Sequence, residues 1–371
     1  MSIVETKAIQ VPEGWHQVAG VIARERGIVL LLGASDAGKT TFARYLIEEW
    51  NREGILVALV DGDIGQSTLG PPTTIGLALF PPASIGAFPP PPVALRFVGA
   101  TSPLGHFLPL IVGLKRLADQ AAEEKAGIVL VDTTGLIHGR AGRELKFQKI
   151  DLLRPQHLIA LERQEELEPL LLLHEGRRGL KVHRLPVAEA VGNKPWEGRR
   201  AHRERKFQEY FHGAHSLELS LKKVRLHGFW FQGGRRLHTN ELAFIEKTLG
   251  TIVLHGEQGP EGLELLVSGG ITSGEHSRIK DVFGVSEVRI ADMENLTGLL
   301  LGLNDAENDT LALGILQGLD LKLGTLSCLT PLQDPKAVRL IQFGSLRIDP
   351  IGRELWIVSL QKPLDKTLFP S

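Results

Sequence analysis

Hydrophobic residues in the first half of the chain follow two alternating patterns. Between stretches of helical spacing lie short uninterrupted apolar runs, which are typical of strands buried on both faces of a parallel sheet. The alternation predicts an α/β fold, with a parallel sheet and flanking helices. The predicted strands are 27–32, 55–60, 127–131, 157–161 and 180–185, and the predicted helices are 41–52, 108–125, 142–153 and 164–174.

The pattern changes after about residue 213. From there on, short β-favouring runs at 217–221, 224–231, 251–255 and 263–267 are separated by glycine-rich turns. We therefore predict a mostly β second domain, a barrel or a sandwich. A length of 371 residues suits two domains. The predicted boundaries are a short N-terminal segment at 1–26, a first domain at 27–213 and a second domain at 214–371.

A glycine-rich turn follows the first predicted strand. Gly33 to Thr40 matches G-x-x-x-x-G-K-[ST], and a helix is predicted to begin near Lys39. In such a P-loop, backbone N–H groups surround the β-phosphate of ATP or another NTP, the lysine bridges the β- and γ-phosphates, and the threonine hydroxyl coordinates Mg²⁺. The predicted nucleotide-binding residues are Gly33, Ala34, Ser35, Asp36, Ala37, Gly38, Lys39, Thr40 and Thr41.

Three acids follow predicted strands at the carboxyl edge of the sheet, where open α/β sheets place their reactive groups. Asp61 and Asp63 follow the second strand, and alternation along a strand directs both to the same side. Phosphoryl transfer needs one carboxylate for the proton of the attacking hydroxyl and another polar group near Mg²⁺, and either acid suits. Alternatively, one of them caps the following turn. Asp132 ends an apolar run as in a Walker B segment, so Thr40, Asp61 and Asp132 are the candidate metal residues.

The turn after Asp132 reads Thr133-Thr134-Gly135. Two hydroxyl groups, with a glycine that permits close approach, suit a grip on a substrate phosphate. Thr-Thr-Gly is also a common turn, so both interpretations stay open from the residues alone.

A strongly basic segment precedes the predicted domain boundary. Residues 177–206 hold ten Lys or Arg against three Glu, and a helix with one basic and one aromatic side is predicted near its end, before Tyr210 and Phe211. Such a helix could be a lid, over about 190–213, that supplies arginine to the γ-phosphoryl group. It could also follow a nucleic-acid backbone or be a solvated surface helix.

Overall composition narrows the class of protein. With 42 Lys and Arg against 43 Asp and Glu, the formal net charge is −1, so an anionic partner requires a local basic patch. The single Cys328 excludes an intramolecular disulfide framework and a cysteine-based zinc site. The N-terminus lacks the pattern of a signal peptide, and no apolar run approaches the length of a membrane span, so we expect a cytoplasmic protein without membrane contact.

Together these motifs resemble those of the polynucleotide 5′-hydroxyl kinases, which include the kinase subunit of eukaryotic pre-mRNA cleavage factor, the nucleolar kinase of ribosomal RNA processing and archaeal RNA kinases. The resemblance rests on the P-loop with its internal aspartate and on the stretches 60–67 (VDGDIGQS), 72–76 (PTTIG), 132–135 (DTTG), 295–303 (NLTGLLLGL) and 313–318 (LGILQG). Two departures are expected. The separate N-terminal β domain of the eukaryotic members is absent, and Leu136 replaces a tryptophan that follows Thr-x-Gly in the family.

The resemblance implies transfer of the γ-phosphate of ATP, with Mg²⁺, to the 5′-OH end of RNA or DNA. Lys39 and Thr40 would be the ATP and Mg²⁺ residues, and Asp63 the base for the 5′-hydroxyl. The substrate would be held near Gln66, Thr133, Thr134 and Gly135, and the lid arginines would be Arg200, Arg203 and Arg205.

Two other functions compete with this one. The protein could be a scaffold of a nucleic-acid-processing assembly that binds ATP without turnover, although the intact Asp61-x-Asp63 and the arginine-rich segment argue against it. A small-molecule kinase or a switch GTPase shares the P-loop, but the guanine signature Asn-Lys-x-Asp is missing from the sequence.

Overall fold

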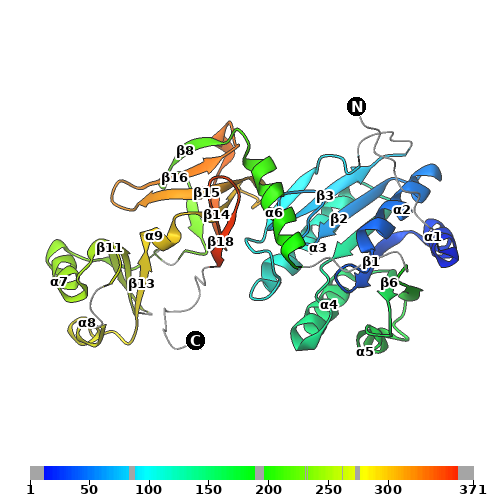
Figure 1. The fold of residues 1–371 in the computed structure, drawn as a ribbon, viewed down its shortest axis with the longest axis horizontal. Coiled ribbons are helices and arrows are strands. Elements are labelled where there is room, and N and C mark those ends of the chain that lie inside the picture. Colours follow the sequence, from blue (N-terminus) through cyan, green and yellow to red (C-terminus); the bar gives the residue numbers. More distant parts are fainter. Residues whose placement is uncertain are drawn as a thin grey trace. The chain divides into compact units, whose positions relative to one another are not determined.

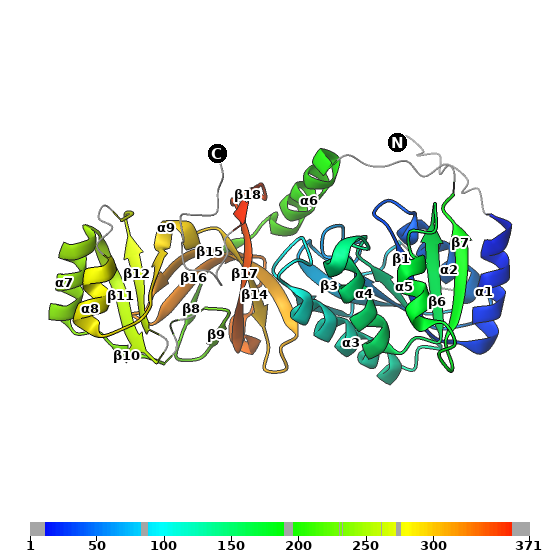
Figure 2. The same cartoon turned by 90° about the horizontal axis from the view of Figure 1, so that it is seen from below.

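The structure is a computed structural model that describes residues 12–82, 88–188, 196–229, 231, 233–260, 262–271 and 276–357. The chain divides into two compact units, one of residues 1–98 with 102–199 and the other of residues 99–101 with 200–371. Figure 1 shows the elements of both units, and Figure 2 shows them from below.

The first unit is built on a seven-stranded sheet in the order β4-β3-β2-β5-β1-β6-β7 (Figure 1). The predicted parallel strands are confirmed, each displaced by two residues at most. They are β1 (Gly27–Gly33), β2 (Val57–Gly62), β5 (Ile128–Thr133), β6 (His157–Glu162) and β7 (Lys181–Pro186). At one edge lie two antiparallel strands that the sequence pattern did not predict, β3 (Thr74–Phe80) and β4 (Ala94–Phe97).

Helices cover both faces of this sheet. One apolar cluster joins the sheet to α1 and α2, and a second joins it to α3, α4 and α5. The predicted periodicity of the helix after the P-loop is confirmed, because Phe42, Leu46 and Trp50 are all fully buried. The helices are α1 (Glu13–Glu25), α2 (Lys39–Arg52), α3 (Phe107–Glu123), α4 (Gly139–Leu153) and the short α5 (Glu168–Leu171), which continues as a 3₁₀ turn over Leu172–His174.

Most of the predicted N-terminal segment belongs to the first unit. Its helix α1 packs against α2 through Trp15, whose ring centroid lies 4.4 Å from that of Phe42. In the other direction, Trp50 donates a hydrogen bond from Nε1 to the backbone oxygen of Ala19, at 3.0 Å. Residues 1–11 lie outside the described residues.

The second unit is mostly β, as predicted. Its larger sheet runs β18-β17-β14-β15-β16-β8, with β9 paired to β17, and its smaller sheet runs β10-β11-β12-β13. The larger sheet comprises β8 (His215–Ser220), β9 (Arg225–His227), β14 (Leu299–Asn304), β15 (Thr310–Asp320), β16 (Thr325–Thr330), β17 (Leu340–Ile348) and β18 (Glu354–Ile357). The smaller comprises β10 (Arg235–Arg236), β11 (Ile252–Gly259), β12 (Gly262–Ser268) and β13 (Val288–Asp292).

The helices of the second unit include several that the sequence pattern did not predict. The unpredicted ones are α7 (Thr239–Leu249), α8 (His276–Phe283) and α9 (Met293–Leu296), with a 3₁₀ turn at Pro335–Ala337. Helix α6 (Trp196–Phe211) was predicted and spans the division between the two units. Helices α7 and α8 pack on the smaller sheet through one apolar cluster. None of the helices in the described ranges is long and apolar enough to cross a membrane.

The predicted basic and aromatic helix is α6, and from Arg200 onward it groups with the second unit. Its aromatic side explains this grouping, because Phe207 and Phe211 are buried and the hydroxyl of Tyr210 accepts a hydrogen bond from the Leu313 amide at 2.8 Å. The division at 199/200 therefore lies ahead of the boundary at 213/214 that was expected from composition. The beginning of the predicted lid, near 190, lies outside the described residues.

Candidate active site

The P-loop connects β1 directly to α2. Gly38, at the N-cap of α2, has a left-handed backbone with φ of 81°, which glycine adopts without strain. Gly33 is also constrained, because a Cβ there would lie 2.9 Å from the backbone oxygen of Leu161. No side chain in the described part of the chain caps α2, so its first amides are available to an anion such as a nucleotide phosphate.

Lys39 is held against this loop. Its side chain is buried, and Nζ donates hydrogen bonds to the backbone oxygens of Gly33, at 3.1 Å, and Ala34, at 2.8 Å. The loop is also joined to the segment that follows β6, since Arg163 donates a hydrogen bond to the backbone oxygen of Asp36 at 3.1 Å. A cation is thus fixed at the position where the motif requires it.

The predicted metal residues Thr40 and Asp132 are brought together by the fold. The hydroxyl of Thr40 donates to Oδ2 of Asp132 at 2.9 Å, while Oδ1 of Asp132 accepts the amide of Thr133 at 2.8 Å. Burial raises the pKa of Asp132 to about 6, and the nearby charge of Lys39 opposes this rise. Within the described part of the chain, no three His, Cys, Asp or Glu side chains cluster as a metal site. The oxygen donors present fit Mg²⁺, which binds through few protein ligands plus phosphate and water.

Asp61 was predicted as a metal residue, and in the structure its carboxylate accepts several hydrogen bonds from its own loop. Its Oδ1 accepts the Asp63 amide at 3.0 Å, and its Oδ2 accepts hydrogen bonds from Ser67, Thr68 and Leu69 at 2.6–3.2 Å. The side chain is buried, which raises its pKa, and the bond from the Asp63 amide opposes that rise. Because both oxygens are occupied within the chain, we assign Asp61 to holding the loop that contains Asp63.

Asp63 retains an available carboxylate oxygen. Its Oδ1 accepts the amides of Gly65, at 3.0 Å, and Gln66, at 3.1 Å, which orients the carboxylate. Its Oδ2 has no hydrogen bond among the described residues. The residue is half-buried. Gln66 contributes its backbone to this turn, and its predicted place beside the acceptor stays a prediction.

The Thr133-Thr134-Gly135 turn lies against the P-loop. Strands β2 and β5 are paired with Asp61 opposite Asp132 and Gly62 opposite Thr133, so the acid loop and this turn leave the same edge of the sheet. The hydroxyl of Thr133 is buried and donates to the backbone oxygen of Leu31 at 2.7 Å. This hydroxyl is therefore engaged within the fold, and a grip of Thr133 on a substrate phosphate stays a prediction. The buried hydroxyl of Thr134 has no hydrogen-bond partner among the described residues.

Gly135 permits this contact, and its replacement should disturb the P-loop. A Cβ at position 135 would lie 2.4 Å from the amide nitrogen and 2.5 Å from the Cα of Ser35. We expect Gly135→Ala to weaken nucleotide binding by roughly tenfold or more, since loop backbone must shift. Titration with a fluorescent ATP analogue measures this change. Gly20→Ala in α1, where a Cβ meets only a flexible arginine end at 3.9 Å, is the control; equal affinity of the two variants would contradict the prediction.

Two lysines of α4, Lys146 and Lys149, join the site although the sequence analysis did not single them out. Both are fully buried. The Nζ of Lys146 donates to the hydroxyl of Thr133, at 2.8 Å, and to the backbone oxygen of Thr134. The Nζ of Lys149 has no hydrogen-bond partner among the described residues. Their spacing in the sequence could have indicated this burial, because both fall on the helical stripe that also holds Leu145, Ile150 and Leu153.

The three predicted lid arginines lie in the second unit with different surroundings. Arg200 donates to the carboxylate of Glu204, at 3.0 Å, and to the backbone oxygen of Glu354, at 2.6 Å. Arg203 forms a bidentate ion pair with Glu354, and the two side chains are only 16% and 10% exposed. Arg205 is exposed and contacts His202. Arg200 and Arg203 thus fasten α6 to β18, and Arg205 is the better lid candidate.

This difference predicts separate effects of two substitutions. Arg203→Ala leaves Glu354 mostly buried without its partner, so we expect a loss of about 2 kcal/mol in the free energy of unfolding. Arg205→Ala should leave stability within about 0.5 kcal/mol, because it is exposed. Urea unfolding of the full chain measures both values. Unchanged stability of Arg203→Ala, with a loss of phosphate transfer, would restore Arg203 as a lid arginine.

The geometry can be compared with known proteins. Residues 33–213 match the family model of the mRNA cleavage and polyadenylation factor CLP1 P-loop. A polyribonucleotide 5′-hydroxyl-kinase of Methanocaldococcus jannaschii is 34% identical, over 89% of this chain and 89% of that protein. One of Pyrococcus furiosus is 33% identical, over 89% and 90% respectively.

Solved structures support the fold. The chain resembles Clp1p in a wild-type Clp1p–Pcf11p complex with a TM-score of 0.58 and 13% identity, covering 92% of this chain and 80% of that one. At this identity the likeness concerns the fold alone. The similarity to the archaeal proteins is much higher and covers nearly all of both sequences, so the resemblance inferred from the motifs is confirmed. The chain belongs to the family of the archaeal polyribonucleotide 5′-hydroxyl-kinases.

Proposed function

We propose that this protein is an ATP-dependent kinase that transfers the γ-phosphate to the 5′-hydroxyl end of RNA. One observation carries the proposal: the carboxylate of Asp63, oriented by two backbone amides and with one oxygen available, follows the strand next to that of Asp132. Asp132 in turn binds Thr40 of the P-loop. These contacts support a proton acceptor and a nucleotide site at the same edge of one sheet.

Each residue has a chemical task in this reaction. The amides of the loop and of the α2 N-terminus hold the β-phosphate, and Lys39 exchanges its loop carbonyls for phosphate oxygens. Mg²⁺, when bound beside Thr40 and Asp132, neutralises charge on the phosphates. Asp63 accepts the proton of the 5′-hydroxyl as that oxygen bonds to the γ-phosphorus, and the bond from the γ-phosphorus to the bridging oxygen breaks to release ADP.

The choice of acceptor rests on the relatives. The archaeal members are named polyribonucleotide 5′-hydroxyl-kinases, which supports RNA ahead of DNA as the acceptor. An exposed arginine such as Arg205 suits the charge of the transferred phosphoryl group. The alternative of an ATP-binding scaffold without turnover is less well supported, because a scaffold has no use for an oriented carboxylate at Asp63.

Phosphate transfer tests the proposal directly. Purified protein with Mg²⁺ and γ-labelled ATP is incubated with 5′-OH RNA, with DNA of the same sequence, and with RNA that already carries a 5′-phosphate. We expect label on the 5′-OH RNA and none on the 5′-phosphorylated RNA. Bound ATP without label on any acceptor would contradict the kinase and favour the scaffold, while label on DNA alone would overturn the acceptor.

A further inference from the structure

The two buried lysines of α4 require an explanation that the fold alone does not supply. Lys146 and Lys149 are one helical turn apart and both fully buried, on the stripe of α4 that packs on the sheet. Their neighbours on this stripe, Leu145 and Ile150, belong to the apolar cluster between α3, α4 and the sheet. Burial of an ammonium group is unfavourable unless nearby groups compensate it. An apolar side chain would suit both positions better for packing.

Lys146 has its compensation in hydrogen bonds. It donates to the hydroxyl of Thr133 and to the backbone oxygen of Thr134. The same Thr133 hydroxyl donates to Leu31 of β1, two residues before the P-loop begins. Lys146 therefore holds the turn after β5 in place through these two hydrogen bonds, which explain its burial.

Lys149 differs because none of the described residues compensates it with a hydrogen bond. Its Nζ is buried and without a partner among the described residues. Burial lowers the pKa of Lys149 to about 7, and the negative charges of Asp63 and Asp132 oppose this lowering. The two carboxylates that act on its charge are thus the proton acceptor and the metal-shell acid of the proposed reaction. A charge in this position has an electrostatic use even without contact.

We propose that Lys149 is a positioning residue of the phosphoryl-transfer site, whose buried charge offsets the negative charge of Asp63 and Asp132. This negative charge must be offset during the reaction, because the approaching acceptor displaces water from the two carboxylates, which would face the triphosphate. In the drier site, repulsion between carboxylates and phosphates grows, and positive charge on the buried Lys149 reduces it. Lys149 acts through these acids and does not touch the substrate. The proposal rests on the kinase function proposed above.

A purely structural role predicts a different pattern of effects. If Lys149 served only packing, Lys149→Met would fill the same space without a buried charge, raising stability and leaving phosphate transfer unchanged. If it serves the site, the same substitution raises stability and lowers transfer. Stability and activity therefore move in opposite directions only under the proposal, which separates it from general damage to the fold.

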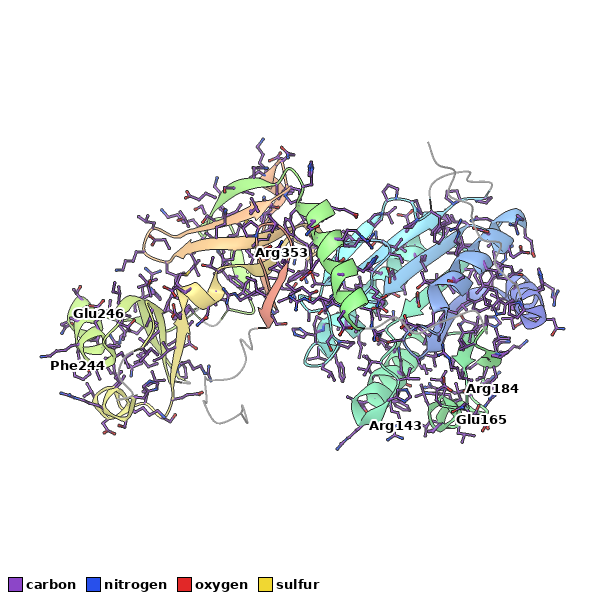
Figure 3. The ribbon with its side chains drawn as sticks, in the orientation of Figure 1. Arg143, Glu165, Arg184, Phe244, Glu246 and Arg353 are labelled. Carbon is purple, nitrogen blue, oxygen red and sulfur yellow. The ribbon has the colours of Figure 1, made fainter. Side chains whose placement is uncertain are left out.

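Lys149→Met is compared with unsubstituted protein and with Arg143→Met. Arg143 lies on the exposed side of the same helix (Figure 3), so its loss removes a positive charge outside the site. We expect Lys149→Met to raise Tm by about 3 °C or more, to keep its nucleotide Kd within about twofold, and to transfer phosphate to 5′-OH RNA in single turnovers roughly tenfold more slowly. Arg143→Met should match the unsubstituted protein in transfer rate.

Several outcomes would overturn the proposal. Transfer at the unsubstituted rate by Lys149→Met shows that its charge has no role, and an equal loss in Arg143→Met shows an effect of net charge. A loss of nucleotide affinity parallel to the loss of transfer indicates damage to the P-loop. If Lys149→Met lowers Tm, Lys149→Gln is measured in its place, and unsubstituted transfer by that variant decides against Lys149. Absence of transfer by the unsubstituted protein itself contradicts the kinase function, and this role with it.

Discussion

Asp63→Asn is expected to lower phosphate transfer to 5′-OH RNA by roughly a thousandfold while leaving ATP binding unchanged. The size follows from the loss of a proton acceptor, because an amide cannot take the proton that the attacking hydroxyl releases. The turn should survive, since the side-chain carbonyl of asparagine can still accept the amides of Gly65 and Gln66. Single-turnover transfer with labelled ATP measures the rate, and titration with a fluorescent ATP analogue measures the affinity.

The chain supplies a matched control for this substitution. Asp320, in the turn between β15 and β16, accepts the amides two and three residues ahead at 2.8 Å each, as Asp63 does in its own turn. Asp320→Asn therefore makes the same chemical change in the same kind of turn, in the second unit, while the nucleotide residues belong to the first. We expect it to transfer phosphate at the unsubstituted rate. Undiminished transfer by Asp63→Asn would remove its assignment as the base.

The contrast between Asp61 and Asp63 shows that the sequence alone does not assign the roles of the two acids. Alternation along a strand placed both acids on one side, and the residues alone left their roles interchangeable. In the structure β2 ends at Gly62, so Asp63 leaves the strand while Asp61 stays in it. Asp61 accepts hydrogen bonds from the loop that follows, the most distant of them from the amide of Leu69, eight residues later. Which acid keeps a free oxygen depends on this loop closure, which no local pattern encodes.

The elements that were predictable depend on local signals. The buried strands were found because uninterrupted apolar runs report burial on both faces, and the P-loop because its spacing follows from the tight turn itself. The aromatic side of α6 predicted that one face is buried, but an amphipathic pattern does not identify the surface that covers it. Helix α6 could therefore be recognised, while its grouping with the second unit could not.

The burial of Lys146 and Lys149 is another feature that the sequence alone did not predict. A lysine at an apolar position of a helix is ordinarily expected to extend its long side chain to water. Its position in the apolar stripe is then no evidence that the charge is buried. In α4 both side chains are fully covered. The groups that interact with them belong to other elements: the Thr133-Thr134 turn for Lys146, and Asp63 after β2 and Asp132 in β5 for Lys149. Chemistry that arises between elements distant in sequence becomes visible only when the fold has placed them together.

Lys39→Ala is expected to lose both nucleotide binding and phosphate transfer, which separates it from Asp63→Asn. Its Nζ is fixed on the carbonyls of Gly33 and Ala34, so alanine removes the buried cation that phosphates would meet at the loop. We expect ATP affinity to fall by roughly a hundredfold, with transfer below detection.

The ATP-induced rise in Tm distinguishes the two variants in one experiment. A ligand that binds the folded protein at a hundred times its Kd stabilises it by about 2.7 kcal/mol. Unsubstituted protein and Asp63→Asn should both show the corresponding rise at such a concentration, and Lys39→Ala should show almost none. An undiminished rise in Lys39→Ala, together with lost transfer, would place the lysine in the chemical step alone. Lys39 would then keep its two hydrogen bonds to the loop in the ATP complex and contact the phosphates only in the transition state. An interaction made only in the transition state changes the rate and leaves ground-state binding intact.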